Sequence, residues 1–482
     1  MSNFYVTTSI PYVNSDPHIG FGMEVVMADV LARYMRQIDV PVIYATGTDE
    51  HGSKIAEKAT EAKISPKQYA DKVSQSFRDL LPLLNVKNDR FVRTTDPAHE
   101  QRAQIIWKNL SRHLYKSSYI GWYCVGHEEY FSEQVVKNNN GVCPEHNRKY
   151  EKLQEDNYFF KLSAFAPKIK AAIDSDTLRI VPQSRKNEIL SLIASGLEDI
   201  SVSRPSDKIP WGIPVPGDDS QVMYVWFEAL TNYITVLGYP EHQDFKNFWP
   251  ANVQIIGKDI LRFHAAIWPA MLMALDLPLP RMLYVHGFVT VDGKKMSKTL
   301  GNVIAPKDVV AKYGADGFRY FFLRHVPSYE DGDFNWDRLE AAYNNELADQ
   351  LGNAVSRTAA MIAKYQKGII GDIPPPSHDM GPYKEAIEAC RFDKALDEIW
   401  EQVKGLNQYI DESKPWEIVK TGDEDHLREV LAYLVGSLLE IANLLTPFLP
   451  DTAKRIIQIF GSGLLKEMPK PLFPKTVKEL NS

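Results

Sequence analysis

Cysteine is scarce in this sequence of 482 residues, and long hydrophobic runs are absent. Three cysteines are too few for a disulfide framework, which excludes small disulfide-stabilised proteins and indicates a reducing compartment. No apolar run reaches the ~18 residues of a transmembrane helix, so we expect no membrane span. The first residues have neither the basic nor the apolar region of a secretion signal. We therefore expect a cytoplasmic protein.

Positively charged residues are also fewer than negatively charged ones. The 55 lysines and arginines are outnumbered by 62 aspartates and glutamates, and the formal net charge of −7 argues against a general nucleic-acid binder. RNA is not excluded, because a local basic stripe can contact phosphates on an acidic protein. The sequence shows no internal repeat and no low-complexity tract, and its length predicts about two to four domains.

Alternating strand and helix patterns fill the first part of the chain. A β-rich segment, a helical repeat that includes Phe21 and Met35, and a second apolar strand predict a β–α–β unit, which implies a parallel sheet. The same alternation returns in the second half of the chain. The expected elements are strands at 4–10, 40–47, 253–259 and 282–290, and a helix at 260–275.

The middle and the end of the chain depart from this pattern. Residues 115–206 hold two cysteines, three consecutive asparagines and many charges, so we interpret them as an insertion that splits an α/β domain. The two halves of that domain would be 1–114 and 207–338. Long helical patterns, broken by a proline-rich loop at 371–382, predict a helix bundle over 339–482.

A histidine and two glycines stand where the first strand turns into the first helix, at His18, Gly20 and Gly22. In an open parallel sheet, ligands bind at the carboxyl ends of strands, and N–H groups at a helix N-terminus attract phosphate. The imidazole can add a hydrogen bond to phosphate, and the glycines allow a ligand to approach the backbone. The dinucleotide fingerprint is not completed, because Val25 follows where a third glycine is required. An ordinary turn is the alternative.

A second set of phosphate-type groups occurs in the segment DGKKMSKTLGN, after a later strand. Lys294, Lys295 and Lys298 lie beside the hydroxyls of Ser297 and Thr299. Mobile lysines can neutralise the charge that develops on a triphosphate in the transition state, although a solvated turn is the alternative. A Walker loop is absent, which excludes a standard P-loop enzyme.

Together, the early PHIGF and the later KMSKT resemble the HIGH and KMSKS signatures of class I aminoacyl-tRNA synthetases. Further segments, in order and spacing, are similar to the methionyl-tRNA synthetase family: PYVNSDPHIG, TGTDEHG, DNYFFKLS, PWGIPVPGD, YVWFEAL, IGKDILRFHAAIWPAM, GNAVSR and KPW. Two positions differ from the signatures. Phe21 replaces the last histidine of HIGH, which removes one phosphate donor, whereas Thr299 replaces a serine and keeps the hydroxyl.

This resemblance implies an α/β Rossmann-like catalytic domain with a parallel sheet, split by a connective-peptide insertion and followed by an all-α anticodon-binding helix bundle. The implied reaction joins L-methionine and ATP, with Mg²⁺, to give methionyl-adenylate and pyrophosphate. Methionine is then transferred to the 3′-terminal adenosine of tRNA(Met). We expect a monomer, because the sequence lacks the C-terminal tRNA-binding domain that dimerises some members of the family.

The resemblance also assigns expected roles to individual residues, and the catalytic groups would be His18, Lys295 and Lys298. Asp49 would hold the substrate ammonium, with the Tyr12 hydroxyl and the His264 imidazole near sulfur. ATP would bind His18, Gly20, Phe21, Glu24, Gly257, Asp259, Val289, Lys295, Ser297 and Lys298. Methionine would bind Ile10, Tyr12, Asp49, Trp226, Ala229, Tyr233, Ile260 and His264. The anticodon would bind Asn353, Arg357 and Trp416, an aromatic ring for stacking beside two base-reading polar groups. The alternative for the aromatic pocket residues is simple core packing.

Two paired cysteine–histidine motifs lie in the insertion. Cys124 and His127 form the first motif, and Cys143 and His146 form the second. Two thiolates and two imidazoles suit a tetrahedral structural zinc ion. The family carries a zinc knuckle in this insertion, but it is usually richer in cysteine, and His127 stands where cysteine is common. A metal-free knuckle with free cysteines is therefore the alternative.

Three other functions share parts of this pattern. Another class I synthetase, for a branched aliphatic amino acid, would carry a much larger editing insertion than residues 115–206 provide. An unrelated adenylyl-transferring enzyme would have no use for the anticodon-type residues of the helical region. A catalytically inactive tRNA-binding paralogue would not need Lys295, Lys298 and Asp49. Methionine-dependent ATP–pyrophosphate exchange distinguishes these alternatives.

Overall fold

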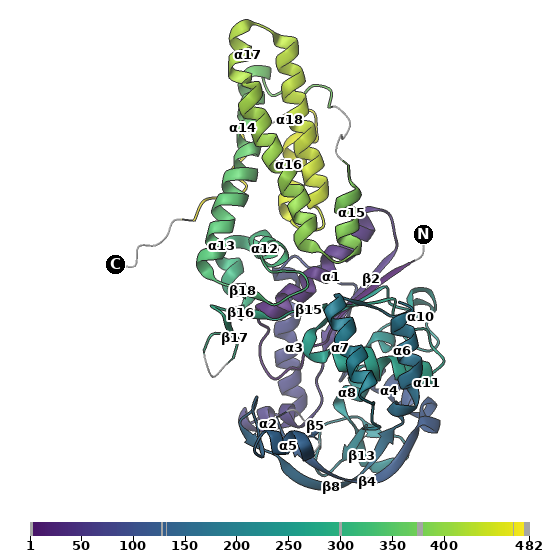
Figure 1. Cartoon of the computed structure of the whole chain (residues 1–482). Coiled ribbons are helices and arrows are strands. Elements are labelled where there is room, and N and C mark those ends of the chain that lie inside the picture. The colour runs from purple at the N-terminus through teal and green to yellow at the C-terminus, as the bar shows by residue number, and fades with distance from the viewer. Residues whose placement is uncertain are drawn as a thin grey trace.

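The computed structural model describes residues 3–126, 129–131, 133–297, 301–373, 379–465 and 467–476. Figure 1 shows an elongated molecule, in which a bundle of long helices stands on a broader α/β part. None of the described helices is both long and apolar enough to cross a membrane.

A parallel sheet of six strands forms the centre of the α/β part. From edge to edge, its strands are β3 (Arg90–Arg93), β2 (Val42–Thr48), β1 (Phe4–Thr8), β14 (Val253–Gly257), β15 (Met282–His286) and β9 (Arg179–Val181). Every neighbouring pair is parallel, which confirms the predicted parallel sheet. Strands β1 and β14 are buried along their whole length, as expected in a parallel sheet that is covered on both faces.

The chain changes direction across the sheet at β1. Helix α1 (Ile19–Gln37) leads from β1 to β2 on one side, whereas β14, from the second half of the domain, pairs with β1 on the other side. Ligands of open parallel sheets bind at such a switch point, outside the carboxyl ends of the strands. The fold therefore places the end of β1, the N-terminus of α1 and the end of β14 together.

The two long strands of the predicted insertion at 115–206 belong to a separate antiparallel sheet, which lies at the end of the molecule farthest from the bundle (Figure 1). However, β9 returns to the central sheet and pairs with β15. The predicted boundary is wrong for this segment, because a three-residue edge strand leaves no periodic pattern in the sequence. The other elements of the region are β4 (Leu114–Cys124), β5 (Glu129–Phe131), α5 (Glu133–Asn138), β6 (Val142–Cys143), β7 (Arg148–Lys149), β8 (Glu151–Phe160), α6 (Ala166–Asp174), α7 (Gln183–Ala194) and β10 (Ile200–Ser201).

The single strand expected at 282–290 is divided in the structure. The chain leaves the central sheet at Gly287, where an added Cβ would lie 2.3 Å from the backbone of Glu330, so only glycine fits. The residues that follow enter a small separate sheet. Its strands are β17 (Lys294–Lys295), β16 (Val289–Val291) and β18 (Gly332–Phe334).

The helix expected at 260–275 is also interrupted. A 3-10 turn, η3 (Lys258–Ile260), and a π-helical turn, η4 (Phe263–Ile267), precede α11 (Trp268–Ala274). Pro269 has no N–H to donate to the preceding turn, which favours the wider hydrogen-bond pattern before it. The π-helical turn carries His264.

Shorter elements complete the α/β part. They are α2 (Ser53–Glu61), α3 (Pro66–Leu83), α4 (Pro97–Asn109), β11 (Ser203–Pro205), β12 (Pro214–Val215), β13 (Asp218–Met223), α8 (Val225–Ala229), α9 (Asn232–Thr235) and α10 (Gln243–Phe248).

Helices alone make up the described part of the chain after β18, which confirms the predicted all-α region. The two longest, α16 (Phe392–Ser413) and α18 (Glu424–Leu445), bury apolar residues at helical spacing and pack against each other. The remaining helices after β18 are α13 (Trp336–Ala342), the π-helix η5 (Tyr343–Gly352), α14 (Asn353–Gln366), α15 (Gly381–Glu388), α17 (Pro415–Thr421) and α19 (Pro450–Phe460), and α12 (Pro306–Arg324) directly precedes β18.

A buried arginine joins the helical region to the α/β part. Arg319 of α12 is fully buried and forms an ion pair with Asp29 of α1, with 2.8 Å between Nη1 and Oδ2. Its Nε donates to the carbonyl of Phe448 at 2.6 Å, and Nη2 donates to that of Pro447 at 2.8 Å. Because these carbonyls lie between α18 and α19, one side chain connects the first helix of the α/β part to the bundle.

Candidate functional site

A groove of about 750 Å³ opens at the carboxyl ends of β1, β2, β14 and β15. Of the residues predicted to bind ATP, it is lined by His18, Gly20, Phe21, Glu24, Gly257, Asp259, Val289 and Lys295. All those predicted to bind methionine line it: Ile10, Tyr12, Asp49, Trp226, Ala229, Tyr233, Ile260 and His264. Ser297 does not line the groove, and its N–H donates to Asn302 Oδ1 at 2.9 Å. Lys298 lies outside the described residues. His18 and Lys295, far apart in the sequence, thus line one groove.

His18 caps the N-terminus of α1. Its Nδ1 accepts a hydrogen bond from the backbone N–H of Gly20 at 3.0 Å. This bond assigns the ring proton to Nε2, which remains available as a donor. The surrounding walls of the groove desolvate the ring and lower the pKa of His18, although the charge of Glu24 opposes this shift. The arrangement therefore presents a neutral imidazole N–H at the positive end of the α1 dipole.

Glu24 connects the end of β1 to the end of β15. Its Oε1 accepts from the backbone N–H and the hydroxyl of Ser9, at 2.6 and 2.7 Å. Its Oε2 lies 3.2 Å from Nε2 of His286, whose Nδ1 donates to the carbonyl of Gly287 at 2.8 Å. Burial disfavours the charged imidazole, but the hydrogen bond and the charge of Glu24 outweigh it and raise the pKa of His286. Burial raises the pKa of Asp259, which lines the same end of the groove.

Sequence reasoning missed several residues of the groove. His286 was not predicted, although it resembles His18 in being a histidine after an apolar strand with a glycine close behind it. Other lining residues, from turns and from the insertion, have no such signal. They are Ser9, Pro11, Glu145, Arg185, Glu188, Leu230, Asn232, Lys258, Gly287, Phe288 and Met296.

Two lysines lie on either side of an aromatic ring at the groove. The Nζ atoms of Lys258 and Lys295 lie 4.5 and 5.4 Å from the ring centroid of Phe288. Lys258 also forms an ion pair with Asp331 at 2.6 Å. Lys295 stands on β17, next to a tight turn in which Gly293 has φ = +72°. This hairpin holds a cationic side chain beside the ends of β14 and β15.

The methionine-type end of the groove is apolar and aromatic. Trp226 stacks on Phe263, with 4.1 Å between ring centroids and 16° between planes. Tyr233 donates its hydroxyl proton to Nε2 of His264 at 2.7 Å, and Nδ1–H of His264 donates to the carbonyl of Ile260 at 3.0 Å. Burial lowers the pKa of His264 to about 4, so this imidazole is neutral. Both of its nitrogens are engaged within the protein, so the expectation that His264 offers a donor to sulfur does not fit this arrangement.

Asp49 and Tyr12 are held side by side at the ends of β2 and β1. The two residues form a parallel bridge, in which the N–H of Asp49 donates to the carbonyl of Pro11 at 2.9 Å. Thr94 approaches Oδ1 of Asp49 at 3.4 Å. The carboxylate is buried in the wall of the groove, with a relative exposure of 4%. A buried acid of this kind can bind an ammonium group.

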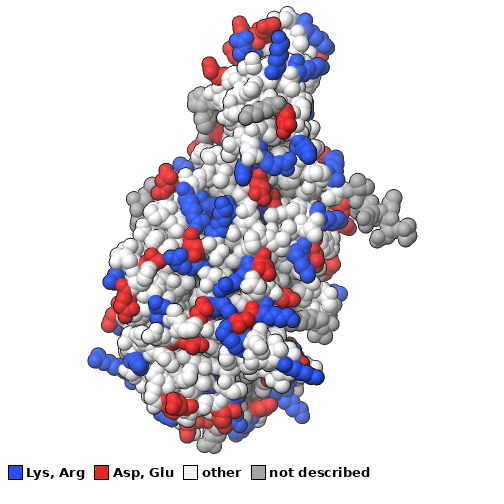
Figure 2. All heavy atoms as spheres, turned by 180° about the vertical axis from the view of Figure 1, so that it is seen from behind, with Lys and Arg blue, Asp and Glu red and all other residues white. Residues whose placement is uncertain are grey.

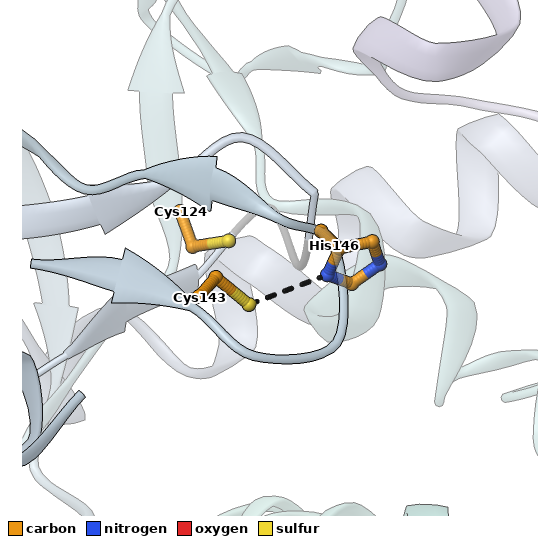
Figure 3. A group of neighbouring side chains, drawn as sticks. All are labelled: Cys124, Cys143 and His146. Carbon is orange, nitrogen blue, oxygen red and sulfur yellow. Dashed lines mark hydrogen bonds between the residues drawn. The ribbon is translucent and has the colours of Figure 1, made fainter. Parts of the chain in front are cut away.

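Three of the four predicted metal ligands come together in the insertion (Figure 3). The ligand atoms of Cys124, Cys143 and His146 lie within 4.8 Å of one another, and Cys143 Sγ is 3.6 Å from His146 Nδ1. Gly126 makes room for the ring, because an added Cβ would lie 2.2 Å from His146 Cγ. His127 lies outside the described residues. Two buried sulfurs beside an imidazole nitrogen fit the donor set of structural zinc.

The residues predicted to read the anticodon lie in the bundle. The guanidinium of Arg357 lies 5.9 Å from the ring centroid of Trp416 and pairs with Asp411 at 2.8 Å. Asn353 is exposed one turn earlier on α14, and Trp416, on α17, is 37% exposed. Figure 1 places α17 at the end of the bundle farthest from the α/β part. The face in Figure 2 carries intermixed basic and acidic side chains from the bundle downward.

Known proteins match this chain over most of its length. The sequence profile of the family described as tRNA synthetases class I (M) matches residues 4–154 and 140–359. A methionine–tRNA ligase from Caldanaerobacter subterraneus subsp. tengcongensis is 42% identical over 95% of this chain and 74% of its own length. One from Brucella melitensis is 38% identical over 98% of both chains.

The fold agrees with a solved structure at the same level of coverage. The Mycobacterium tuberculosis methionyl-tRNA synthetase in complex with methionyl-adenylate matches with a TM-score of 0.91 and 33% identity, covering 98% of this chain and 100% of that chain. These matches confirm the resemblance that the motifs indicated. With its parallel sheet, its split catalytic domain and its helical region, the chain belongs to the methionyl-tRNA synthetase family of the class I aminoacyl-tRNA synthetases.

Proposed function

We propose that the chain is a methionine–tRNA ligase, which activates L-methionine with ATP and then transfers methionine to the 3′-terminal adenosine of tRNA(Met). The observation that carries this proposal is the single groove lined by His18, Lys295 and Asp49. It joins a phosphate-type end, with an imidazole N–H and a lysine, to an aromatic pocket with a buried carboxylate. A related enzyme that was solved with methionyl-adenylate supports the same assignment.

In the proposed first step, ATP lies across the N-terminus of α1. Nε2–H of His18 donates to a phosphate oxygen, the positive end of the α1 dipole attracts the phosphates, and Lys295 neutralises charge on the departing pyrophosphate. Phe21 offers no donor and packs edge-on against Phe77, with 5.2 Å between ring centroids. We therefore assign the phosphate contacts to His18 and the helix N-terminus. Lys298 would join Lys295, and Mg²⁺ would accompany ATP.

Methionine would lie with its ammonium group on Asp49 and its thioether in the aromatic pocket. Tyr233 lines this pocket, and its hydroxyl proton is held by His264. A carboxylate oxygen of methionine attacks the α-phosphorus of ATP, and the bond from that phosphorus to pyrophosphate breaks. No covalent enzyme intermediate is needed, so the chain contributes positioning and charge stabilisation. A ribose hydroxyl of the tRNA then attacks the adenylate carbonyl, and AMP leaves.

Methionine-dependent ATP–pyrophosphate exchange tests this function. We expect labelled pyrophosphate to enter ATP when methionine is added and not when isoleucine or valine is added. Exchange with a branched amino acid instead would favour another class I synthetase. If the folded protein shows no exchange with any amino acid, this result would favour an inactive tRNA-binding paralogue and overturn the proposal.

The anticodon proposal has its own test in the bundle. We expect Trp416→Ala to raise the KM for tRNA(Met) by about 10–100-fold, because base–aromatic stacking contributes ~1–3 kcal/mol. Exchange without tRNA should stay at the wild-type rate, because α17, which carries Trp416, lies at the end of the bundle farthest from the α/β part (Figure 1). Arg428→Ala is the matched control, since this exposed arginine of α18 pairs only weakly, with Asp425 at 3.5 Å. An unchanged KM for tRNA in Trp416→Ala would refute the assignment.

We also propose one structural zinc ion in the knuckle, held by Cys124, Cys143, His146 and His127. The purified protein should contain about one equivalent of zinc, since tetrahedral structural sites bind one ion. We expect Cys143→Ser to lose the metal and Cys390→Ser to keep it, because Cys390 is buried in the helical core. Elemental analysis measures both variants. Zinc-free wild-type protein after careful purification would support a metal-free knuckle. We further propose that the chain acts as a monomer in the cytoplasm.

A further inference from the structure

Behind the methionine end of the groove, two imidazoles and one carboxylate are buried together. Glu228 Oε1 lies 2.9 Å from His51 Nδ1, and Glu228 Oε2 lies 2.9 Å from His99 Nε2. The three residues are exposed by only 2% or less, and none of them lines the groove. We call this group the His51–Glu228–His99 clamp. Each oxygen of the carboxylate is thus held by a different segment of the chain.

The clamp carries ionised groups although its residues are buried. Burial disfavours the imidazolium, but the charge and hydrogen bond of Glu228 and the contact with Glu100 raise the pKa of His51 to about 10. Burial likewise favours the neutral acid, yet the two histidines lower the pKa of Glu228. At neutral pH the clamp therefore pairs a carboxylate with an imidazolium. Buried pairs of this kind add little net stability compared with apolar packing, so a geometric role is the better explanation.

The clamp binds the rear face of the short helices α8 and α9. Trp226, Ala229 and Tyr233 line the groove at spacings of three and four residues, which places them on one helical face. Glu228 and Thr235 lie seven residues apart on another face. His99 contacts both of them, through Nε2 to Glu228 and through Nδ1 to Thr235 Oγ1 at 2.8 Å. One imidazole therefore spans the rear of the wall.

Side-chain hydrogen bonds bridge the turn between the two helices. Thr231 Oγ1 donates to the carbonyl of Glu228 at 2.6 Å, and Asn232 Nδ2 donates to that of Ala229 at 2.7 Å. The position of Glu228 is thus coupled to that of Tyr233, which follows Asn232 directly.

The other end of the clamp belongs to the opposite wall of the groove. His51 follows two residues after Asp49, at the end of β2. The bond from His51 to Glu228 therefore ties the strand end that carries the buried carboxylate to the helix that carries Trp226.

We propose that His51, His99 and Glu228 are positioning residues that fix the spacing between Asp49 and the wall formed by α8 and α9. This spacing sets the affinity for methionine, since the ammonium group and the side chain must be bound at once. The inference rests on the proposed function. None of the three residues touches the substrate, and each acts through a neighbour that lines the groove.

Glu228→Gln tests the clamp, because it keeps the size of the side chain and removes its charge. We expect the KM for methionine in exchange, and the Kd for methionine by calorimetry, to rise by about 10–100-fold, since displacements near 1 Å cost that much. The KM for ATP should stay within about two-fold of the wild type, because the ATP-type residues lie on other elements. A merely structural role would not separate the two substrates in this way.

Glu346→Gln is the matched control. This carboxylate also contacts a histidine, His325 Nε2 at 3.2 Å, but it lies in the helical region and lines no part of the groove. It should leave both KM values unchanged. Thr235→Val keeps the volume and removes only the hydroxyl that holds His99, and we expect it to raise the KM for methionine by about 3–10-fold. If Glu228→Gln does not fold, the KM for methionine of Thr235→Val tests the clamp by itself.

Two results would overturn the clamp. One is a wild-type KM for methionine in the folded variants, and the other is an equal rise in the KM for methionine and for ATP. Wild-type protein without any methionine-dependent exchange would instead refute the proposed function. In that case the calorimetric Kd for methionine still tests the clamp, so the two failures remain distinguishable.

Discussion

Lys295→Ala should lower the rate of methionine-dependent ATP–pyrophosphate exchange by about 10²–10³-fold, as the removal of one preorganised charge-stabilising group does in other enzymes. Lys295 lines the groove and stands beside Phe288, on the hairpin formed by β16 and β17. It would act mainly on the charge that develops as pyrophosphate departs. We therefore expect kcat to fall more than the KM for methionine changes.

Lys294 provides a matched control one residue away. It has the same charge and the same strand, β17, but it does not line the groove. Lys294→Ala should keep the exchange rate within about two-fold of the wild type, as expected for an exposed charge. Equal losses in the two variants would indicate a general electrostatic effect of the hairpin. An undiminished rate in Lys295→Ala would contradict the placement of the triphosphate at this end of the groove.

The second large effect concerns stability. Arg319→Met should lower the free energy of unfolding by about 3–5 kcal/mol, because it removes a buried ion-pair partner of Asp29 and leaves several backbone carbonyls without their donor. Arg319 is fully buried, and its bonds join Asp29 in α1 to Pro447 and Phe448 beside the bundle. Urea denaturation of the purified variant measures the change.

Arg36→Met is the control for this variant. Arg36 pairs with Asp89 at 2.6 Å and belongs to the same helix, α1, but about a third of each side chain is exposed. Its removal should cost only ~0–1 kcal/mol, since solvent screens an exposed pair. Similar losses for the two variants would mean that burial of Arg319 does not determine its contribution.

Much of the fold could be predicted from local patterns. The strand at the N-terminus, the helix that follows it and the strands at 40–47 and 253–259 each have a periodic or continuous apolar signal of sufficient length. The prediction failed where the signal was short or mixed. Strand β9 spans only three residues, and the segment at 282–290 supplies strands to two different sheets around Gly287.

The two motifs that form the phosphate-type end of the candidate site could each be predicted from the sequence. The histidine and glycines before α1, and the lysines after β16, each carry a chemical signal at a strand end. Family resemblance implied that they serve one nucleotide, and the groove brings His18 and Lys295 together. The pairings behind the walls had no such signal. Glu24 with His286, and Glu228 with His51 and His99, join residues from distant segments.

By itself, the sequence determined the main strands of the parallel sheet, the helical character of the last part of the chain and the chemical character of both motifs. These properties depend on periodicity and on turn residues, which act over a few neighbouring positions. Only the tertiary structure decided that His264 turns its nitrogens toward Tyr233 and Ile260, and that His51 ties two walls of the groove together. Such partners depend on burial and hydrogen bonding between elements, and these interactions exist only once the sheet and its covering helices have assembled.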